Sequence, residues 1–222
     1  MAGSCEKKII VREGNGYYEE KKSRFLSEAF HVCTEEEVVE ILEKIRKEHY
    51  DASHHCYAYE IGEDGRMMRA ADDGEPGGTA GMPILEVIRG EELRDTLIVV
   101  TRYFGGTLLG TGGLTRAYRE AAKDALRNSE TSPLYKGIRS AFSVPYTEQG
   151  KIEYLFRENG WYILSTAYTA EVAFVVLVPE EDKGKAEALL KEKTGGKIGL
   201  SSGEICQYIV ADGRAVIFSE DQ

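Results

Sequence analysis

The chain has 222 residues, of which 28 are lysine or arginine and 38 are aspartate or glutamate, so its formal charge is −10. This length allows one large domain or two small ones. The acidic balance argues against a protein that coats nucleic acid by bulk charge, but it leaves room for a local basic groove. Half of the 24 glycines lie between Gly62 and Gly113, and such a cluster marks required backbone shapes.

The sequence carries no signal for a membrane or for secretion. No apolar run approaches the roughly 20 residues that a membrane-spanning helix needs, and the first residues lack the apolar core of a signal peptide. None of the four cysteines is spaced as CxxC, which favours reduced thiols. We therefore predict a cytoplasmic protein without a membrane partner.

The first part of the chain mixes strand and helix patterns. Residues 16–32 predict two strands that meet near Lys21–Ser23. Thr34 and Glu37 form a capping box, and apolar residues at helical spacing then predict a helix to about His49. Glu63-Asp64-Gly65 is a hairpin turn signal. Further predicted strands are 54–61, 66–71 and 97–103, and further predicted helices are 83–90 and 114–128.

The second part predicts a strand–helix–strand–strand–helix–strand order, which is that of ferredoxin-like domains. A linker is expected around 129–137, and residues 212–222 are expected to form a C-terminal extension. Asn159-Gly160 and Gly195-Gly196 are the expected helix ends. The predicted elements are strand 138–146, helix 147–159, strands 161–168 and 170–178, helix 179–194 and strand 197–210.

The strongest local feature is the glycine-rich segment 104–113, which follows a strand and precedes a helix. Backbone N–H groups at a helix N-terminus can bind an anion such as phosphate, and Arg102 and Arg116 can add charge. The spacing fits neither a P-loop nor a dinucleotide-binding loop. The alternative is a tight structural loop that needs positive φ.

A second loop, 72–81, places Asp72, Asp73 and Glu75 within four residues. These carboxylates suggest Mg²⁺ ligands or an acid/base pair, and the alternative is a turn in which they bond the loop backbone. The EF-hand order is absent, and we predict no metal and no cofactor.

Two shorter motifs complete the candidates. In His54-His55-Cys56 the strand alternation places His54 and Cys56 on one face and His55 on the other. A Cys–His pair or half a zinc site competes there with hydrogen-bonded histidines in a half-buried strand. The segment 20–25 combines three cations with an aromatic residue, a pattern that can contact phosphate and stack on a base, or that forms a solvated turn.

Four segments together resemble the IMPACT family, in particular its bacterial YigZ-like branch. They are KKSRF (21–25), HHCYAY (54–59), DDGEPGGTAGMPIL (72–85) and VTRYFGGTLLGTGGLTRAY (100–118). The resemblance implies an α+β protein of two domains. Residues 1–133 would resemble ribosomal protein S5 domain 2, with helices on one sheet face. Residues 137–211 would form a ferredoxin-like domain similar to domain V of elongation factor G.

The resemblance implies a role in translational control, because eukaryotic members of the family act there. It supplies no catalytic residues, since the family has no accepted enzymatic activity. We therefore expect a non-enzymatic regulator that binds RNA, the ribosome or a translation factor; no DNA-specific motif is present. An enzyme that handles a phosphate or nucleotide with Mg²⁺ is the alternative, and a protein adaptor that docks through residues 137–222 is a third.

All candidate binding residues fall in the first domain. The proposed anion, RNA or partner site comprises Lys22, Arg24, His54, Asp72, Asp73, Glu75, Arg102, Tyr103, Gly105, Gly106, Gly110, Gly112 and Gly113.

Overall fold

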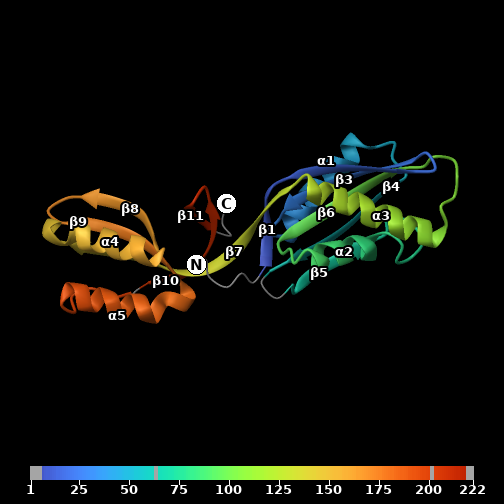
Figure 1. Ribbon diagram of the computed structural model, residues 1–222. Helices are drawn as coiled ribbons and strands as arrows, with labels where there is room; N and C mark the ends of the chain where they lie inside the picture. The colour runs from blue at the N-terminus through green and yellow to red at the C-terminus, as the bar shows by residue number, and fades with distance from the viewer. Residues whose placement is uncertain (1–6, 63–64, 201–202, 219–222) are drawn as a thin grey trace. The chain divides into compact units, whose positions relative to one another are not determined.

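The computed structural model describes residues 7–62, 65–200 and 203–218 (Figure 1). The chain divides into two compact units, one comprising Lys7–Ser132 and the other containing the chain from Pro133 onward. Within the described ranges, no helix combines the length and apolar character needed to cross a membrane.

The first unit is built on a five-stranded antiparallel sheet of order β2-β3-β6-β4-β5. Its strands are β2 (Gly14–Glu20), β3 (Ser23–His31), β4 (His54–Ile61), β5 (Met67–Ala71) and β6 (Thr96–Tyr103). The two strands predicted within 16–32 are confirmed, and they meet at Lys21 and Lys22, which both have positive φ. Of the predicted turn at 63–65, Glu63 and Asp64 lie outside the described residues.

Helices cover both faces of this sheet. Tyr57 and Tyr59 pack with α1 (Glu35–Glu48) on one face, whereas Cys56 and Ala58 pack on the other face with helices α2 and α3. The implied arrangement with helices on one face is therefore wrong. Its physical reason is that β4 and β6 are apolar on both sides, so each side must be covered. The helices of the second face are α2 (Gly81–Gly90) and α3 (Gly110–Arg127).

Helix α3 begins four residues before its predicted start at Leu114. Gly110, Gly112 and Gly113 therefore belong to its first turn and not to a loop. Glycine has a low helix propensity, so the sequence pattern favoured a loop here. The apolar face that begins at Leu114 is buried against the sheet, and this packing stabilises the helix that the glycines precede.

The unit from Pro133 onward has the predicted βαββαβ order. Its sheet runs β11-β10-β7-β9-β8, and its two longer helices pack on the same core against one face of β9. Gly160 and Gly195 end these helices in the left-handed conformation, as predicted. The elements are β7 (Glu130–Val144), α4 (Gln149–Asn159), β8 (Tyr162–Tyr168), β9 (Val172–Pro179), α5 (Lys183–Thr194), β10 (Glu204–Ala211) and β11 (Arg214–Phe218), with short 3₁₀ helices at Tyr146–Glu148 and Glu180–Asp182.

Three predictions about the strands of this part are corrected. No linker interrupts 130–144, because β7 is one continuous strand that also pairs with β1 (Lys7–Arg12). The segment 212–222, predicted as an extension, contains β11, which pairs antiparallel to β10. Asp212 and Gly213 both have positive φ, and an Asp-Gly pair is the residue choice of a tight hairpin turn. The last long strand also begins at Glu204 and not at Lys197.

Strand β2 packs so closely on α3 that Gly16 has no room for a side chain. A Cβ at this position would overlap the backbone of Ala125 and would lie 2.7 Å from the carbonyl carbon of Asp124. We predict that Gly16→Ala lowers the free energy of unfolding by about 1–3 kcal/mol, because backbone must move. Gly90→Ala is the matched control, since nothing lies within 4 Å of its Cβ position. Equal urea midpoints for both variants would contradict the close packing.

Candidate functional site

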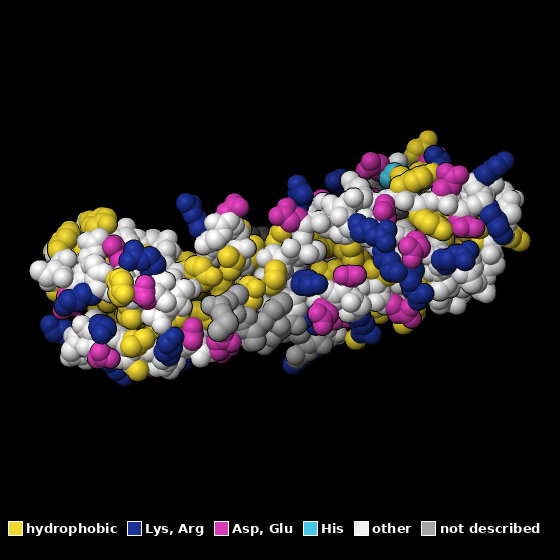
Figure 2. Space-filling model, in the orientation of Figure 1, with side chains coloured by type: hydrophobic (Ala, Val, Ile, Leu, Met, Phe, Trp, Pro, Cys, Tyr) yellow, Lys and Arg dark blue, Asp and Glu magenta, His cyan; other side chains and the backbone are white. Residues whose placement is uncertain are grey.

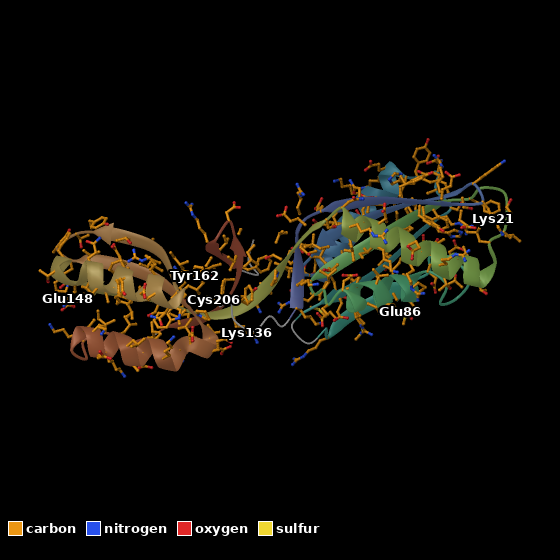
Figure 3. The ribbon with its side chains drawn as sticks, viewed as in Figure 1. Lys21, Glu86, Lys136, Glu148, Tyr162 and Cys206 are labelled. Atoms are coloured by element: carbon orange, nitrogen blue, oxygen red, sulfur yellow. The ribbon has the colours of Figure 1, made fainter. Side chains whose placement is uncertain are left out.

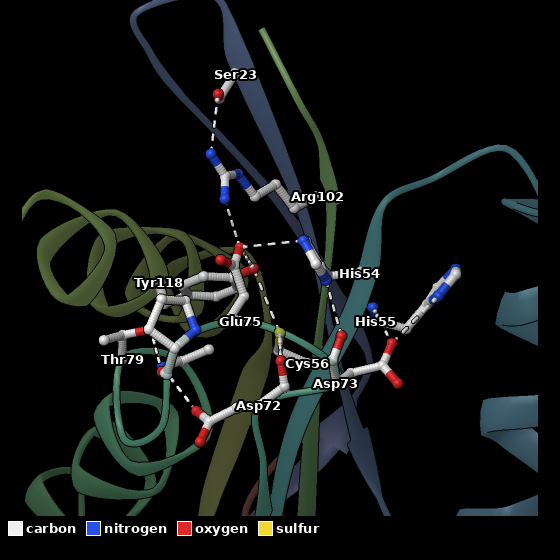
Figure 4. A network of polar contacts seen from close by, with 12 residues as sticks. Ser23, His54, His55, Cys56, Asp72, Asp73, Glu75, Thr79, Arg102 and Tyr118 are labelled. Atoms are coloured by element: carbon white, nitrogen blue, oxygen red, sulfur yellow. Dashed lines mark hydrogen bonds and ion pairs between the residues drawn. The ribbon is translucent and has the colours of Figure 1, made fainter. Parts of the chain in front are cut away.

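One end of the sheet gathers chain segments that are far apart in sequence. Strands β3, β6 and β4 are neighbours, and their register pairs Arg24 with Tyr103 and His54 with Arg102. The loop that follows β5 folds over this end and contributes a polar network (Figure 4). The network comprises Ser23, His54, His55, Cys56, Asp72, Asp73, Glu75, Thr79, Arg102 and Tyr118.

A buried ion pair lies at the centre of the network. Arg102 Nη1 is 2.5 Å from Glu75 Oε1, and the two side chains are 5% and 4% exposed. Tyr118 Oη donates to the same carboxylate oxygen at 2.8 Å, and Arg102 Nη2 donates to Ser23 Oγ at 3.3 Å. Arg102 is therefore neutralised inside the fold, which corrects the expectation that it offers its charge to an outside phosphate.

The other two carboxylates of the loop face different partners. Asp72 accepts hydrogen bonds from the backbone N–H groups of Gly78, Ala80 and Gly81 at 2.7–3.0 Å, so it caps helix α2. Burial alone would raise the pKa of Asp72, but these three hydrogen bonds outweigh burial and hold the pKa below its usual value. The N-terminus of α2 is thus occupied by the protein's own anion.

Asp73 ties the loop to β4 and α1. Its Oδ2 accepts from the backbone N–H of His55 at 2.7 Å, and its Oδ1 lies 3.7 Å from Arg46 Nη2. The three carboxylates consequently do not converge, and the described part of the chain contains no cluster of three His, Cys, Asp or Glu side chains placed to hold a metal ion. This geometry gives the Mg²⁺ alternative no ligand set.

The His-His-Cys motif has the predicted alternation. His54 Nδ1 donates to the carbonyl of Asp73 at 2.7 Å, because a carbonyl can only accept, and its Nε2 lies 3.9 Å from Glu75 Oε1. Cys56 is fully buried and donates to the carbonyl of Asp72 at 3.0 Å. Burial raises the pKa of the Cys56 thiol far above its usual value, so it is not an activated nucleophile.

The glycine-rich segment lies against the β2–β3 turn. Gly105 donates its backbone N–H to Ser23 Oγ at 3.1 Å, and a Cβ there would overlap the backbone of Lys22 and Ser23. Gly106 and Gly110 have φ of +83° and +71°, values that favour glycine. These glycines are therefore explained by close approach and by backbone conformation.

The outer side of this end is cationic and apolar. Lys22 is exposed, the Arg24 guanidinium lies 4.8 Å above the Tyr103 ring, and Phe104 and Leu108 are 50% and 83% exposed. Figure 3 shows Lys21 at this end of the unit, and lysine and arginine side chains stand there in Figure 2. We call this area the loop surface; it comprises Lys21, Lys22, Arg24, Tyr103, Phe104, Leu108, Gly110–Gly113 and Arg116.

The N-terminus of α3 opens on the loop surface without a cap. No side chain in the described part of the chain bonds its first N–H groups, and its first turn contains no acidic residue. Arg116 lies nearby on α3, 4.0 Å from Glu20. In contrast to α2, the backbone donors and the positive dipole end of α3 therefore have no described side chain as a partner.

The structure divides the predicted site residues into two sets. The polar network contains His54, Asp72, Asp73, Glu75 and Arg102, of which Asp73 is exposed. The loop surface or its supporting loop contains Lys22, Arg24, Tyr103 and the five glycines. Sequence reasoning gave no site role to Ser23, Tyr118, Phe104 or Leu108. Tyr118 sits in a helical apolar pattern, and nothing in that pattern signals its hydroxyl contact with Glu75.

Fold and site together define a two-domain α+β protein with a glycine-rich surface on its first domain. Residues 21–126 match the Impact N-terminal domain, and residues 142–197 match DUF1949, a domain of unknown function. The IMPACT family member YvyE of Bacillus subtilis is 40% identical over 185 residues, which are 83% of this chain and 85% of that protein. The chain therefore belongs to the IMPACT family, as the sequence motifs predicted.

Other relatives agree with this assignment. The IMPACT family member YigZ of Escherichia coli is 35% identical over 182 residues, 81% of this chain and 89% of that protein. The Protein IMPACT homolog of Dictyostelium discoideum is 40% identical over 95 residues, 27% of its length. A crystal structure described as that of a hypothetical protein superposes with a TM-score of 0.56 at 32% identity, covering 91% of this chain and 97% of the other.

The capping role of Asp72 predicts a pH dependence of stability. Because its pKa is lowered in the folded protein, its contribution is present above the unfolded value near pH 4 and is lost as pH falls through the folded value. Asp72→Asn should lower the free energy of unfolding by about 1 kcal/mol at pH 7. The difference from the unsubstituted protein should shrink in acid; a difference that is constant from pH 7 to pH 3 in thermal unfolding would contradict this.

The buried pair predicts a non-additive response to substitution. Glu75→Gln leaves the Arg102 guanidinium buried without a counter-charge, so it should cost about 3–5 kcal/mol of stability. Adding Arg102→Met removes the orphaned charge and should recover part of that loss. Chemical denaturation of both single variants and the double variant measures the coupling. Additive losses would show that the two side chains act independently.

Proposed function

We propose that this protein is a non-enzymatic regulator of translation that binds RNA, including RNA presented on the ribosome, through the loop surface. The observation that carries the proposal is the uncapped N-terminus of α3 beside exposed cations and an exposed aromatic ring. Membership of the IMPACT family supports the translational part, because the resemblance of the sequence to that family implies such a role.

The chemistry of the loop surface suits a single-stranded phosphate backbone. Free N–H groups at a helix N-terminus bind phosphate oxygens, and Lys21, Lys22 and Arg24 supply local positive charge in a chain that is acidic as a whole. Exposed aromatic side chains such as Phe104 accept unstacked bases. A small site of this kind tolerates the charge of −10, because phosphate charges separated from the acidic residues by more than about 8–10 Å are largely screened from them.

An enzyme that uses Mg²⁺ on a phosphorylated substrate receives less support. Asp72, Asp73 and Glu75 bond to different groups of the protein, and Cys56 is buried with a raised pKa. The network stabilises the loops more than it offers reactive groups.

Removing one cation at a time tests the proposal. Lys22→Gln and Arg24→Gln should each weaken binding of a fluorescent single-stranded RNA and of ribosomes. For each lost phosphate contact, the slope of log affinity against log salt should fall by about 0.7. Glutamine removes the charge and keeps a polar side chain, and anisotropy and co-sedimentation provide the two readouts.

Lys47→Gln is the matched control, because Lys47 is an exposed cation on α1 whose one ion pair with a described residue is with Glu43 on the same helix. It should leave affinity and salt slope unchanged. RNA binding with the same slope in all three variants would refute the loop surface as the site, and an absence of RNA and ribosome binding by the unsubstituted protein would refute the function.

A further inference from the structure

A second concave site lies at the other end of α3. A cavity of about 340 Å³ opens between β1, the connection from α2 to β6, the last turns of α3 and the start of β7. Helix α3 has 18 residues, so at 1.5 Å per residue this cavity is roughly 20–25 Å from the loop surface. It is independent of the proposed RNA site. Its lining comprises Lys8, Glu91, Leu93, Lys123, Leu126, Arg127 and Thr131.

The backbone holds one wall of the cavity in place. Lys8 donates its N–H to the carbonyl of Glu92 at 2.9 Å, and its own carbonyl accepts from Arg94 N–H at 3.0 Å. Both backbone groups of Lys8 therefore hydrogen-bond to the segment that carries Glu91 and Leu93. The half-buried Lys8 side chain starts from a rigid position, which limits the entropy lost when it binds a ligand.

Positive charge predominates in the lining. Three cations face one carboxylate, so the lining carries a net charge of +2. Lys8 makes no ion pair with any residue that the structure describes. The ammonium group of Lys123 lies 3.3 Å from Glu120, and Arg127 lies 3.9 Å from Asp124. These are partly exposed pairs within one helix, and pairs that water reaches contribute little energy. Both cations can therefore turn toward a ligand.

The cavity also has an apolar part. Leu93 is 1% exposed, and the partly buried Leu126 packs against the main core of the unit. A bare inorganic ion would leave the exposed part of Leu126 in contact with water. A ligand that combines a charged group with an apolar group would use both kinds of lining, and the volume is that of a small-molecule site.

We propose that this cavity binds a small phosphate monoester with an apolar organic group. A monoester carries close to two negative charges at neutral pH, which matches the net charge of the lining. Arg127 can bond two phosphate oxygens with its planar fork, and the lysines provide compact point charges. The apolar group lies against the exposed part of Leu126, in front of the buried Leu93.

Phenyl phosphate is the probe for a test on the full chain. Isothermal titration should show saturable binding, with inorganic phosphate binding more weakly and phenol not at all. Lys8→Met and Lys123→Met should each weaken phenyl phosphate at least about tenfold, because each removes a charge-assisted contact. Thr131→Trp should also weaken it by filling the cavity. Thermal unfolding establishes that each variant is folded.

Two controls separate this site from the rest of the surface. Lys44→Met, on α1 and outside the lining, and Lys22→Gln, on the loop surface, should leave phenyl phosphate binding unchanged. The proposal is overturned if unsubstituted protein does not bind the probe, if Lys8→Met and Thr131→Trp bind it as tightly as the unsubstituted protein, or if Lys22→Gln abolishes binding. If inorganic phosphate bound as tightly as phenyl phosphate, the proposal that the ligand carries an apolar group would be overturned.

Discussion

The first domain depends on the buried pair of Arg102 and Glu75. A charge pair that is 5% and 4% exposed depends on further hydrogen bonds. Ser23 and Tyr118 provide two of them, whereas Arg102 Nε has no partner among the described residues. Through these bonds one guanidinium links the start of β3, the end of β6, the loop after β5 and helix α3. The acidic loop and the glycine-rich loop are thereby held on the same end of the sheet, and the candidate site exists because of that linkage.

Helices α2 and α3, which cover the second face of the sheet, differ in what lies at their N-termini. Asp72 accepts from the N–H groups of Ala80 and Gly81 at the start of α2. Helix α3 begins with glycines, has no capping side chain among the described residues and lies beside the cations of the β2–β3 turn, with Gly105 in close contact with Lys22. The positive end of the helix dipole therefore has a carboxylate partner at α2 and no described one at α3.

Much of the fold could be predicted because it depends on local patterns. The capping box at Thr34, the alternation of His54, His55 and Cys56, and the βαββαβ order follow from hydrogen-bond geometry and from periods of 3.6 and 2 residues. Two predictions were wrong because packing overrides local propensity. The glycines predicted to lie in a loop form the first turn of α3, and β7 continues through the predicted linker. The Asp212-Gly213 pair is a local signal for a hairpin turn, and it indicates the strand β11 that follows it.

The sequence by itself determined the family and the order of the elements, because motifs and periodicity are properties of neighbouring residues. Only the tertiary structure decided what those residues do. Charge, size and spacing made Arg102 a candidate for phosphate binding, but burial against Glu75 gave it a structural role. Asp72, Asp73 and Glu75 are close in sequence, yet their carboxylates point to three different partners. Burial and direction depend on contacts between distant segments, and no local pattern encodes them.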